Sequence, residues 1–188
     1  MRSNQGGNGS YWASNIVGPL ISKPIDYNTF YFIKVGSDYR NRISNFATEG
    51  TYAEAGKLPD WPELNKSDID GMVMGRTGVS VEPVDWGIDF DGKVFLLVNG
   101  SVYSAADQFV SFCKDSGFAT IVGSTTEGDG GGITPIWSQM PNTKLLFIYR
   151  VTYILNPDGS CNQEKGVTPD IYTDGDALEA CLEHINAG

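Results

Sequence analysis

An apolar run that ends in a short turn and then a helix constrains the fold of this chain more than any other feature. Lys93–Val98 is rich in aliphatic and β-branched residues, which is typical of a strand. Residues 99–103 predict a turn, and the apolar spacing after Ser104 predicts a helix that ends at Gly117. Because a strand leads directly into a helix, this segment favours an α/β fold.

The rest of the chain continues the alternation of strands and helices. Further strands are expected at Thr29–Val35, Gly71–Val81, Ala119–Val122 and Lys144–Leu155. Further helices are expected after Ser10, which would cap the first of them, and around Leu178–Ile185. The length of 188 residues predicts one domain, 1–188, in which residues 36–92 form a long irregular excursion.

Composition excludes several classes of function. The formal net charge of −10 argues against a nucleic-acid partner, because such a surface repels phosphate backbones. The three cysteines, Cys113, Cys161 and Cys181, lack the spacing of a zinc site, so no metal is expected. No cofactor is expected either. Cys113 and Cys181 fall on apolar helix faces and are expected in the core. No segment has the length of a transmembrane helix, and the compartment stays open.

Ser104 is the candidate nucleophile. At the start of a helix its hydroxyl would lie beside unpaired backbone N–H groups and the positive end of the helix dipole. A hydroxyl there can attack a carbonyl, and the N–H groups can hold the oxyanion that forms. The alternative interpretation is that Ser104 only caps the helix.

A pair of glycines, Gly6 and Gly7, could let the backbone approach a substrate carbonyl, or could simply form a turn. In the first interpretation, an N–H from this pair and the N–H of Ala105 form an oxyanion hole. The loop Gly123–Gly132 lacks the Lys-Ser/Thr pair of a phosphate-binding loop, so a flexible loop beside a cleft is favoured. Glu164 is either a solvated carboxylate or the group that orients a catalytic base.

In order, four segments resemble motifs of the C-terminal processing, or tail-specific, serine peptidases. The matching segments are Arg2–Gly7, Asn99–Asp107, Asp115–Gly123 and Gly166–Asp170. The resemblance implies a crotonase/ClpP-like α/β fold of ββα units and cleavage of peptide or protein substrates through an acyl-enzyme. It also implies that Ser104 is the nucleophile and that Gly6, Gly7 and Ala105 hold the oxyanion.

The resemblance fails at the general base. In the branch with a Ser–Lys dyad, the glycine-rich loop carries a lysine, and Asp129 stands at that position here. Lys114 lies ten residues along the helix of Ser104, roughly 15 Å away at about 1.5 Å per residue. A dyad that uses Lys165 or Lys144 stays open, although no motif supports it. The branch that resembles the tricorn core peptidases uses an upstream histidine, with a glutamate at the position of Glu164. The single histidine of this chain, His184, matches no family position.

A truncated sequence would explain the missing histidine, with Met1 standing at an internal position of the family's first motif. The expectation is then that an N-terminal region supplies the histidine and the lost strand. Relatives that work outside the cytoplasm suggest an extracellular or cell-envelope location.

Two other functions remain open. One is a non-catalytic module that binds a peptide or an apolar ligand on the same fold. The other is an acyl-CoA enzyme of the wider crotonase superfamily, although CoA phosphates would be repelled by this acidic chain.

Overall fold

The computed structural model describes residues 2–34, 60–62, 64–70, 72–130, 136–150 and 152–187. The chain divides into two compact units, each built from separate stretches of sequence. Unit 1 comprises Met1–Asn28, Gly78–Gly131 and Cys161–Gly188, and unit 2 comprises Thr29–Thr77 and Gly132–Ser160. Of the predicted irregular excursion, 36–92, residues 36–59 lie outside the described residues, and the described remainder contains the short helix η4 (Lys66–Ile69) and strand β2 (Met72–Val81).

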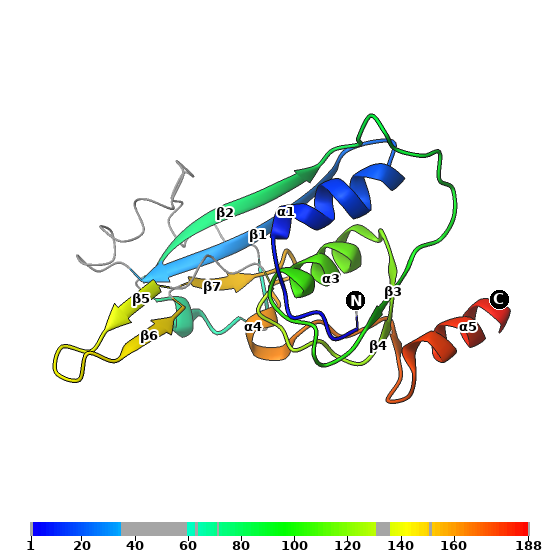
Figure 1. Cartoon of the computed structure of the whole chain (residues 1–188). Coiled ribbons are helices and arrows are strands. Elements are labelled where there is room, and N and C mark those ends of the chain that lie inside the picture. Colours follow the sequence, from blue (N-terminus) through cyan, green and yellow to red (C-terminus); the bar gives the residue numbers. More distant parts are fainter. Residues whose placement is uncertain are drawn as a thin grey trace. The chain divides into compact units, whose positions relative to one another are not determined.

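A parallel sheet forms the centre of unit 1. Its strand order is β3-β4-β8, with bounds Phe95–Val98, Thr120–Gly123 and Ile171–Tyr172. Helix α3 (Ala105–Ser116) connects β3 to β4 and is followed by Gly117 in the left-handed conformation, as the sequence predicts. This strand–helix–strand connection is the α/β arrangement expected from residues 93–122 (Figure 1).

The two faces of this sheet carry different helices. Leu96 and Val98 join a buried core with Phe109 and Phe112 of α3. Phe95 alternates to the other face, where its ring meets that of His184 on helix α5 (Ala177–Ala187). Helices α3 and α5 therefore cover opposite faces of the β3–β4 pair, and both the α3 and α5 cysteines, Cys113 and Cys181, are buried as expected.

The N-terminal helical segment completes the core of unit 1. It begins as α1 (Gly9–Trp12), continues as a π-helical turn, η1 (Ala13–Val17), and ends in a 3₁₀ turn, η2 (Gly18–Leu20). The indole of Trp12 packs on Phe112 with ring centroids 4.7 Å apart. The prediction that Ser10 caps this helix was wrong, because the side chain of Asn8 accepts the N–H of Ser10 instead.

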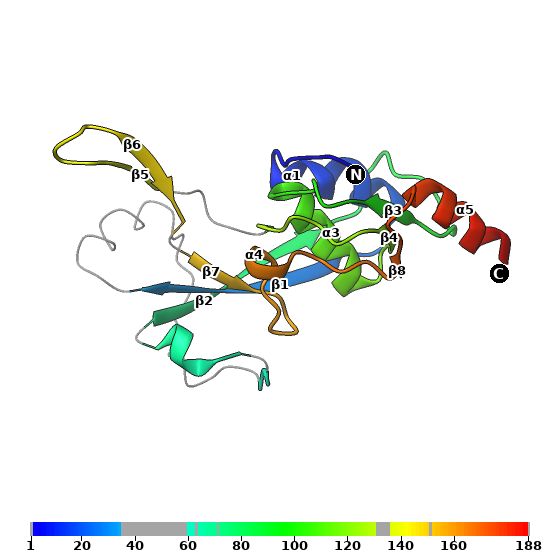
Figure 2. The ribbon, with the colours of Figure 1, turned by 90° about the horizontal axis from the view of Figure 1, so that it is seen from below.

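Unit 2 contains parts of two antiparallel arrangements (Figure 2). Strands β1 (Ile25–Lys34) and β7 (Thr152–Leu155) pair antiparallel, and β2 (Met72–Val81) lies on the other side of β1. Strands β5 (Ile136–Gln139) and β6 (Leu146–Tyr149) form a separate hairpin. The expected single β segment Lys144–Leu155 is therefore two strands that belong to different sheets.

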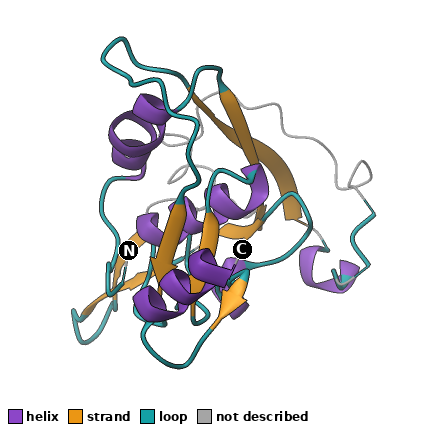
Figure 3. Ribbon diagram, turned by 90° about the vertical axis from the view of Figure 1, so that its right-hand side faces the viewer, coloured by secondary structure: helices purple, strands orange, loops and turns teal. Residues whose placement is uncertain are grey.

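Two further short helices are η4 (Lys66–Ile69) and α4 (Asn162–Lys165), the latter in unit 1. Figure 3 distinguishes the described helices, strands and loops by colour. Among the described helices, none is both long and apolar enough to span a membrane.

Candidate active site

Ser104 occupies the junction between the turn after β3 and the first residue of α3. Its backbone has φ 58° and ψ −127°, a region that non-glycine residues rarely occupy. Its side chain makes no capping hydrogen bond to the helix, which contradicts the alternative that Ser104 is only a cap. Such strain, of order 1–3 kcal/mol, is retained where the surrounding structure holds a residue in place, often at active sites.

The glycine-rich loop lies alongside this junction. Tyr103 and Gly128 form a parallel bridge, and the N–H of Ser104 donates to the carbonyl of Gly128 at 3.0 Å. The N–H of Glu127 donates to the carbonyl of Val102 at 2.9 Å. Asp129, which the resemblance places at the lysine position of the dyad branch, therefore follows directly on the residue that is bonded to Ser104.

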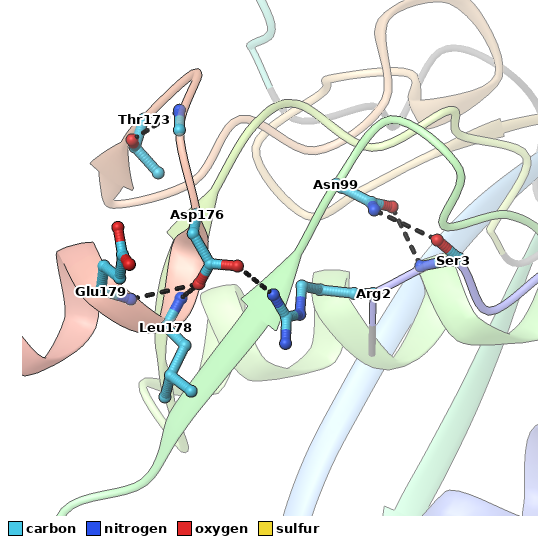
Figure 4. A network of polar contacts seen from close by, with 8 residues as sticks. Arg2, Ser3, Asn99, Thr173, Asp176, Leu178 and Glu179 are labelled. Carbon is cyan, nitrogen blue, oxygen red and sulfur yellow. Dashed lines mark hydrogen bonds and ion pairs between the residues drawn. The ribbon is translucent and has the colours of Figure 1, made fainter.

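The N-terminal segment is fixed to the turn before Ser104 (Figure 4). The N–H of Ser3 donates to Oδ1 of Asn99 at 3.0 Å, and Arg2 forms an ion pair with Asp176 at 2.7 Å. The N–H of Tyr103 donates to the carbonyl of Asn4, also at 3.0 Å. The contacts of Ser3 and Asn4 thus attach the N-terminal segment to residues 99–103, and Arg2 attaches it to Asp176.

Asp176 also holds the start of α5. Its carboxylate accepts the backbone N–H groups of Leu178 and Glu179, and these bonds, with a smaller contribution from Arg2, lower its pKa. One carboxylate thus joins the N-terminal segment to the last helix.

Gly6 lies against Ser104. A Cβ built on Gly6 would be 2.9 Å from Cβ of Ser104, and its φ of 113° suits glycine. The N–H of Gly6 donates to Oδ1 of Asn4 at 3.0 Å. Among the described residues no acceptor is found for the N–H of Gly7, the next residue along the chain.

A cavity of about 310 Å³ opens beside these backbone groups. It is lined by Asn4, Gly6, Gly7, Asn8, Tyr11, Trp12, Ile16, Ala105, Ala106 and Phe109. The candidate oxyanion residues Gly6, Gly7 and Ala105 therefore share one cavity wall. Ala105 is the first residue of α3, so no preceding helical turn supplies an acceptor for its N–H.

Sequence reasoning missed Asp107, a fully buried carboxyl three residues after Ser104. It accepts a hydrogen bond from the Thr126 hydroxyl and another from the N–H of Gly130 at 3.0 Å. Oγ1 of Thr126 in turn accepts the N–H of Val167 at 2.7 Å. Burial raises the pKa of Asp107 to about 6, despite the two hydrogen bonds that lower it, and the nearby charge of Asp129 adds to the rise.

This buried carboxyl fixes helix α3 to the glycine-rich loop and, through Thr126, to the segment Gly166–Asp170. The backbone of Gly130 lies close against this carboxyl, since a Cβ on Gly130 would be 2.6 Å from Oδ2 of Asp107. The available signal was an acidic residue between two apolar helix positions, Ala106 and Val110, which are both buried.

Glu164 lies on α4, which is attached to the same loop. The carbonyl of Asn162, the first residue of α4, accepts the N–H of Asp129 at 3.3 Å. The side chain of Asn162 donates to Ser111 of α3, whose hydroxyl donates to the carbonyl of Asp107 at 3.1 Å. Glu164 itself is exposed.

The structure leaves two other candidates away from Ser104. His184 meets Phe95, whose ring centroid is 6.1 Å from that of the imidazole. Phe95 is the first residue of β3, whereas Ser104 follows the last residue of that strand. Phe95, and with it His184, is therefore separated from Ser104 by the length of the strand, about 10 Å. Lys114 donates to the carbonyl of Thr168. Among the described residues no group of three potential metal ligands exists.

Solved structures with the same fold support the α/β prediction. A peptidase from Parabacteroides merdae is similar over all of this chain and 50% of its own, with TM-score 0.63 and 18% identity. Mature CPAF is similar over 99% of this chain and 41% of its own, with TM-score 0.63 and 18% identity. The photosystem II D1 C-terminal processing protease is similar over 97% and 36%, with TM-score 0.53 and 19% identity. The chain thus spans half or less of these structures.

A shorter sequence match is to an enzyme that is not a peptidase. Over 77 residues the chain is 31% identical to 1-deoxy-D-xylulose 5-phosphate reductoisomerase of Listeria monocytogenes, which covers 40% of this chain and 20% of that enzyme. A match to a fifth of an enzyme does not indicate a shared family.

A family of peptidases matches most of the chain in sequence. The model of peptidase family S41 matches residues 1–173, which include Ser104, both candidate glycines and Glu164. By this match the chain belongs to peptidase family S41, the serine peptidases that include C-terminal processing proteases.

Proposed function

We propose that this chain carries the nucleophile and the oxyanion hole of a serine peptidase, and that Ser104 is the nucleophile. The observation that carries the proposal is the strained backbone of Ser104, whose hydroxyl makes no cap bond and lies beside Gly6. A serine held at a strand-to-helix turn presents its Oγ outward, as the nucleophile of an acyl-transfer enzyme must.

In the proposed reaction Oγ of Ser104 forms a bond to the scissile carbonyl carbon, and its proton passes to a base. The tetrahedral oxyanion then collapses, the carbon–nitrogen bond breaks, and the leaving amine takes the proton. Water hydrolyses the acyl-enzyme by the reverse sequence and releases the acid. The substrates would be peptides or proteins, and no cofactor takes part.

The oxyanion would be held by the backbone N–H groups of Ala105 and Gly7. Gly6 supports this assignment in another way, because its own N–H is bonded to Asn4 and its missing Cβ lets the chain approach Ser104. Removing one donor from such a hole costs about 10²–10³ in turnover.

The base would be a histidine from outside these 188 residues, oriented by Glu164 in the manner of the tricorn-like branch. Two observations support this proposal: Lys114 is bonded to Thr168, and His184 lies at the other end of β3. The resemblance adds a third argument, because it places Asp129 at the lysine position of the dyad branch. Loss of a catalytic base lowers turnover by about 10³-fold or more, so the chain alone would be nearly inactive.

The test is labelling by a small fluorophosphonate with and without added imidazole, followed by mass spectrometry of the tryptic peptides. We expect slow labelling of Ser104 that imidazole accelerates, because a free base can replace the missing one. Ser104→Ala should abolish the label. Ser101→Ala, in the same turn, is the matched control and should keep it. A label that survives in Ser104→Ala, or none even with imidazole, would refute the nucleophile.

A non-catalytic ligand-binding module is the second candidate, and the apolar cavity beside Ser104 favours it. It predicts that an apolar peptide binds the chain while no condition produces a covalent label on Ser104.

A further inference from the structure

We propose that the cavity beside Ser104 selects substrates with a large apolar side chain on the residue whose carbonyl is attacked. This inference rests on the proposed function, because it assigns the cavity to the acyl side of the bond that Ser104 would cleave. It names a substrate class that the family match leaves open.

The position of the cavity supports the assignment to the acyl side. Its wall includes Gly7 and Ala105, the two residues whose N–H groups would hold the carbonyl oxygen. The side chain of the attacked residue branches from the atom bonded to the carbonyl carbon. When that oxygen is held by this wall, the side chain is the nearest part of the substrate that can fill the space beside it.

The chemistry of the wall predicts an apolar occupant. Two of its lining residues, Trp12 and Phe109, are almost fully buried, at 4% and 3% exposure. Two others, Tyr11 and Ile16, are exposed, at 63% and 37%. No lining residue carries a charge, so a charged substrate side chain would be buried here without a partner.

The two asparagines in the wall do not alter this prediction. Oδ1 of Asn4 accepts the N–H of Gly6, and Oδ1 of Asn8 accepts both the N–H and the hydroxyl of Ser10. These oxygens are occupied by the local turns that shape the wall. The small side chains of Ala105 and Ala106 leave room, and a volume of about 310 Å³ suits an aromatic or branched aliphatic group.

The test uses peptidyl diphenyl phosphonates that differ only in the side chain next to phosphorus: benzyl, hydrogen, carboxymethyl or aminobutyl. Such probes contain only the acyl side of a substrate. Labelling rates at Ser104 are measured on the whole chain at constant imidazole. We expect the benzyl probe to react about 10- to 100-fold faster than the hydrogen probe, and the carboxymethyl probe to react slowest.

A charge in the wall should change the preference. In Ile16→Glu the benzyl-to-hydrogen ratio should fall about tenfold, and the aminobutyl probe should become faster than in the natural chain. Ile88→Glu is the matched control, since Ile88 is also an exposed isoleucine of unit 1 but lies outside the cavity. In Ile88→Glu the benzyl-to-hydrogen ratio should stay unchanged. The gained reaction with the aminobutyl probe distinguishes altered selection from unfolding.

The outcomes separate this inference from the proposed function. If the small fluorophosphonate labels Ser104 while the benzyl-to-hydrogen ratio is near one, the selection is refuted and the nucleophile stands. If the fluorophosphonate fails as well, the proposed function itself fails. A ratio that is high but unmoved by Ile16→Glu would place the selective contact elsewhere and overturn the inference.

Discussion

The strand pairs β3–β4 and β5–β6 have the same length but opposite environments. In β3–β4, of unit 1, Leu96, Val98, Ile121 and Val122 are buried. In β5–β6, of unit 2, every residue of β6 is exposed, including the aliphatic Leu146 and Ile148. Both sequences are equally apolar, so strand composition alone does not decide which pair enters a core.

The covering elements explain the difference. Helices α3 and α5 pack on the two faces of β3–β4, whereas within unit 2 no described helix makes comparable contacts with the hairpin. Threonine side chains near the two strand pairs also differ in burial. Thr126 of unit 1 is buried and hydrogen-bonded to Asp107, whereas Thr143 in the turn of the hairpin is exposed. Side-chain changes in β3–β4 should therefore lower the free energy of unfolding, whereas equal changes in β5–β6 should leave it nearly unchanged.

The largest contrast is expected from matched isoleucines. Ile121→Ala removes a fully buried side chain and should lower the free energy of unfolding by about 3–4 kcal/mol, by lost burial and by the cavity left behind. Ile148→Ala, at a side chain 52% exposed, should change it by less than about 1 kcal/mol. Urea denaturation of both variants measures this. Similar losses would show that the hairpin is packed in solution.

The next contrast concerns pH. The pKa of Asp107 is about 6 in the folded chain and 3.8 in the absence of its folded surroundings. Between these two pH values the folded state therefore binds a proton that the unfolded state has lost, and this proton stabilises the fold. This stabilisation is complete below about pH 4 and is lost as the pH rises through 6, a change of about 3 kcal/mol.

The check is the free energy of unfolding of the natural chain minus that of Asp107→Asn, measured from pH 4 to 7. This difference should fall as the pH rises, because asparagine does not titrate. The hairpin 136–149 contains no carboxyl group, so its hydrogen exchange, corrected for intrinsic rates, should not follow this transition. A difference that rises with pH would contradict the buried environment of Asp107.

A smaller contrast is expected from matched threonines. Thr126→Val removes the hydroxyl that donates to Asp107 and accepts from Val167, and should cost about 2 kcal/mol. Thr126→Ser should recover most of this loss. Thr143→Val removes only an exposed contact to the N–H of Leu145 at 3.4 Å and should cost about 0.5 kcal/mol or less. Thermal unfolding of the three variants provides the measurement. Equal costs at both threonines would show that the hydrogen bonds of Thr126 stabilise the fold no more than an exposed contact does.

The smallest effect on stability is expected from Leu146→Lys. Leu146 is 66% exposed, so the free energy of unfolding should change by about 0.5 kcal/mol or less. Self-association should nevertheless decrease, because a lysine on an exposed strand discourages pairing between edges. Light scattering against concentration measures this effect. A large loss of stability would mean that Leu146 is covered.

Local patterns predicted the part of the fold that surrounds Ser104. The strand before it, the helix after it and the end of that helix at Gly117 follow from apolar spacing and glycine chemistry, and the structure confirms them. The division of residues 144–155 between two sheets was missed, because strand propensity does not identify the partner of a strand. The cap at Asn8 was missed because Ser10 is an equally good capping residue.

The candidate site was predictable only in part. The order of motifs along the chain suggested that the first glycines meet Ser104, and the structure places Gly6 beside it. Asp107 could not be found in this way, because its partners Thr126 and Gly130 come from a loop whose path is set by tertiary contacts. Burial raises the pKa of this carboxyl, and the burial of a single polar residue cannot be predicted from the residues next to it in the sequence.

The contact between Arg2 and Asp176 has a consequence for synthesis on the ribosome. These residues are 174 positions apart, yet the segment that begins at Arg2 places Gly6 against Ser104. Strand β3, helix α3 and strand β4 can assemble once residue 123 has emerged, since their contacts are local. The last anchor of the N-terminal segment is translated much later. A nascent chain therefore carries its serine helix well before the glycines beside it are fully secured.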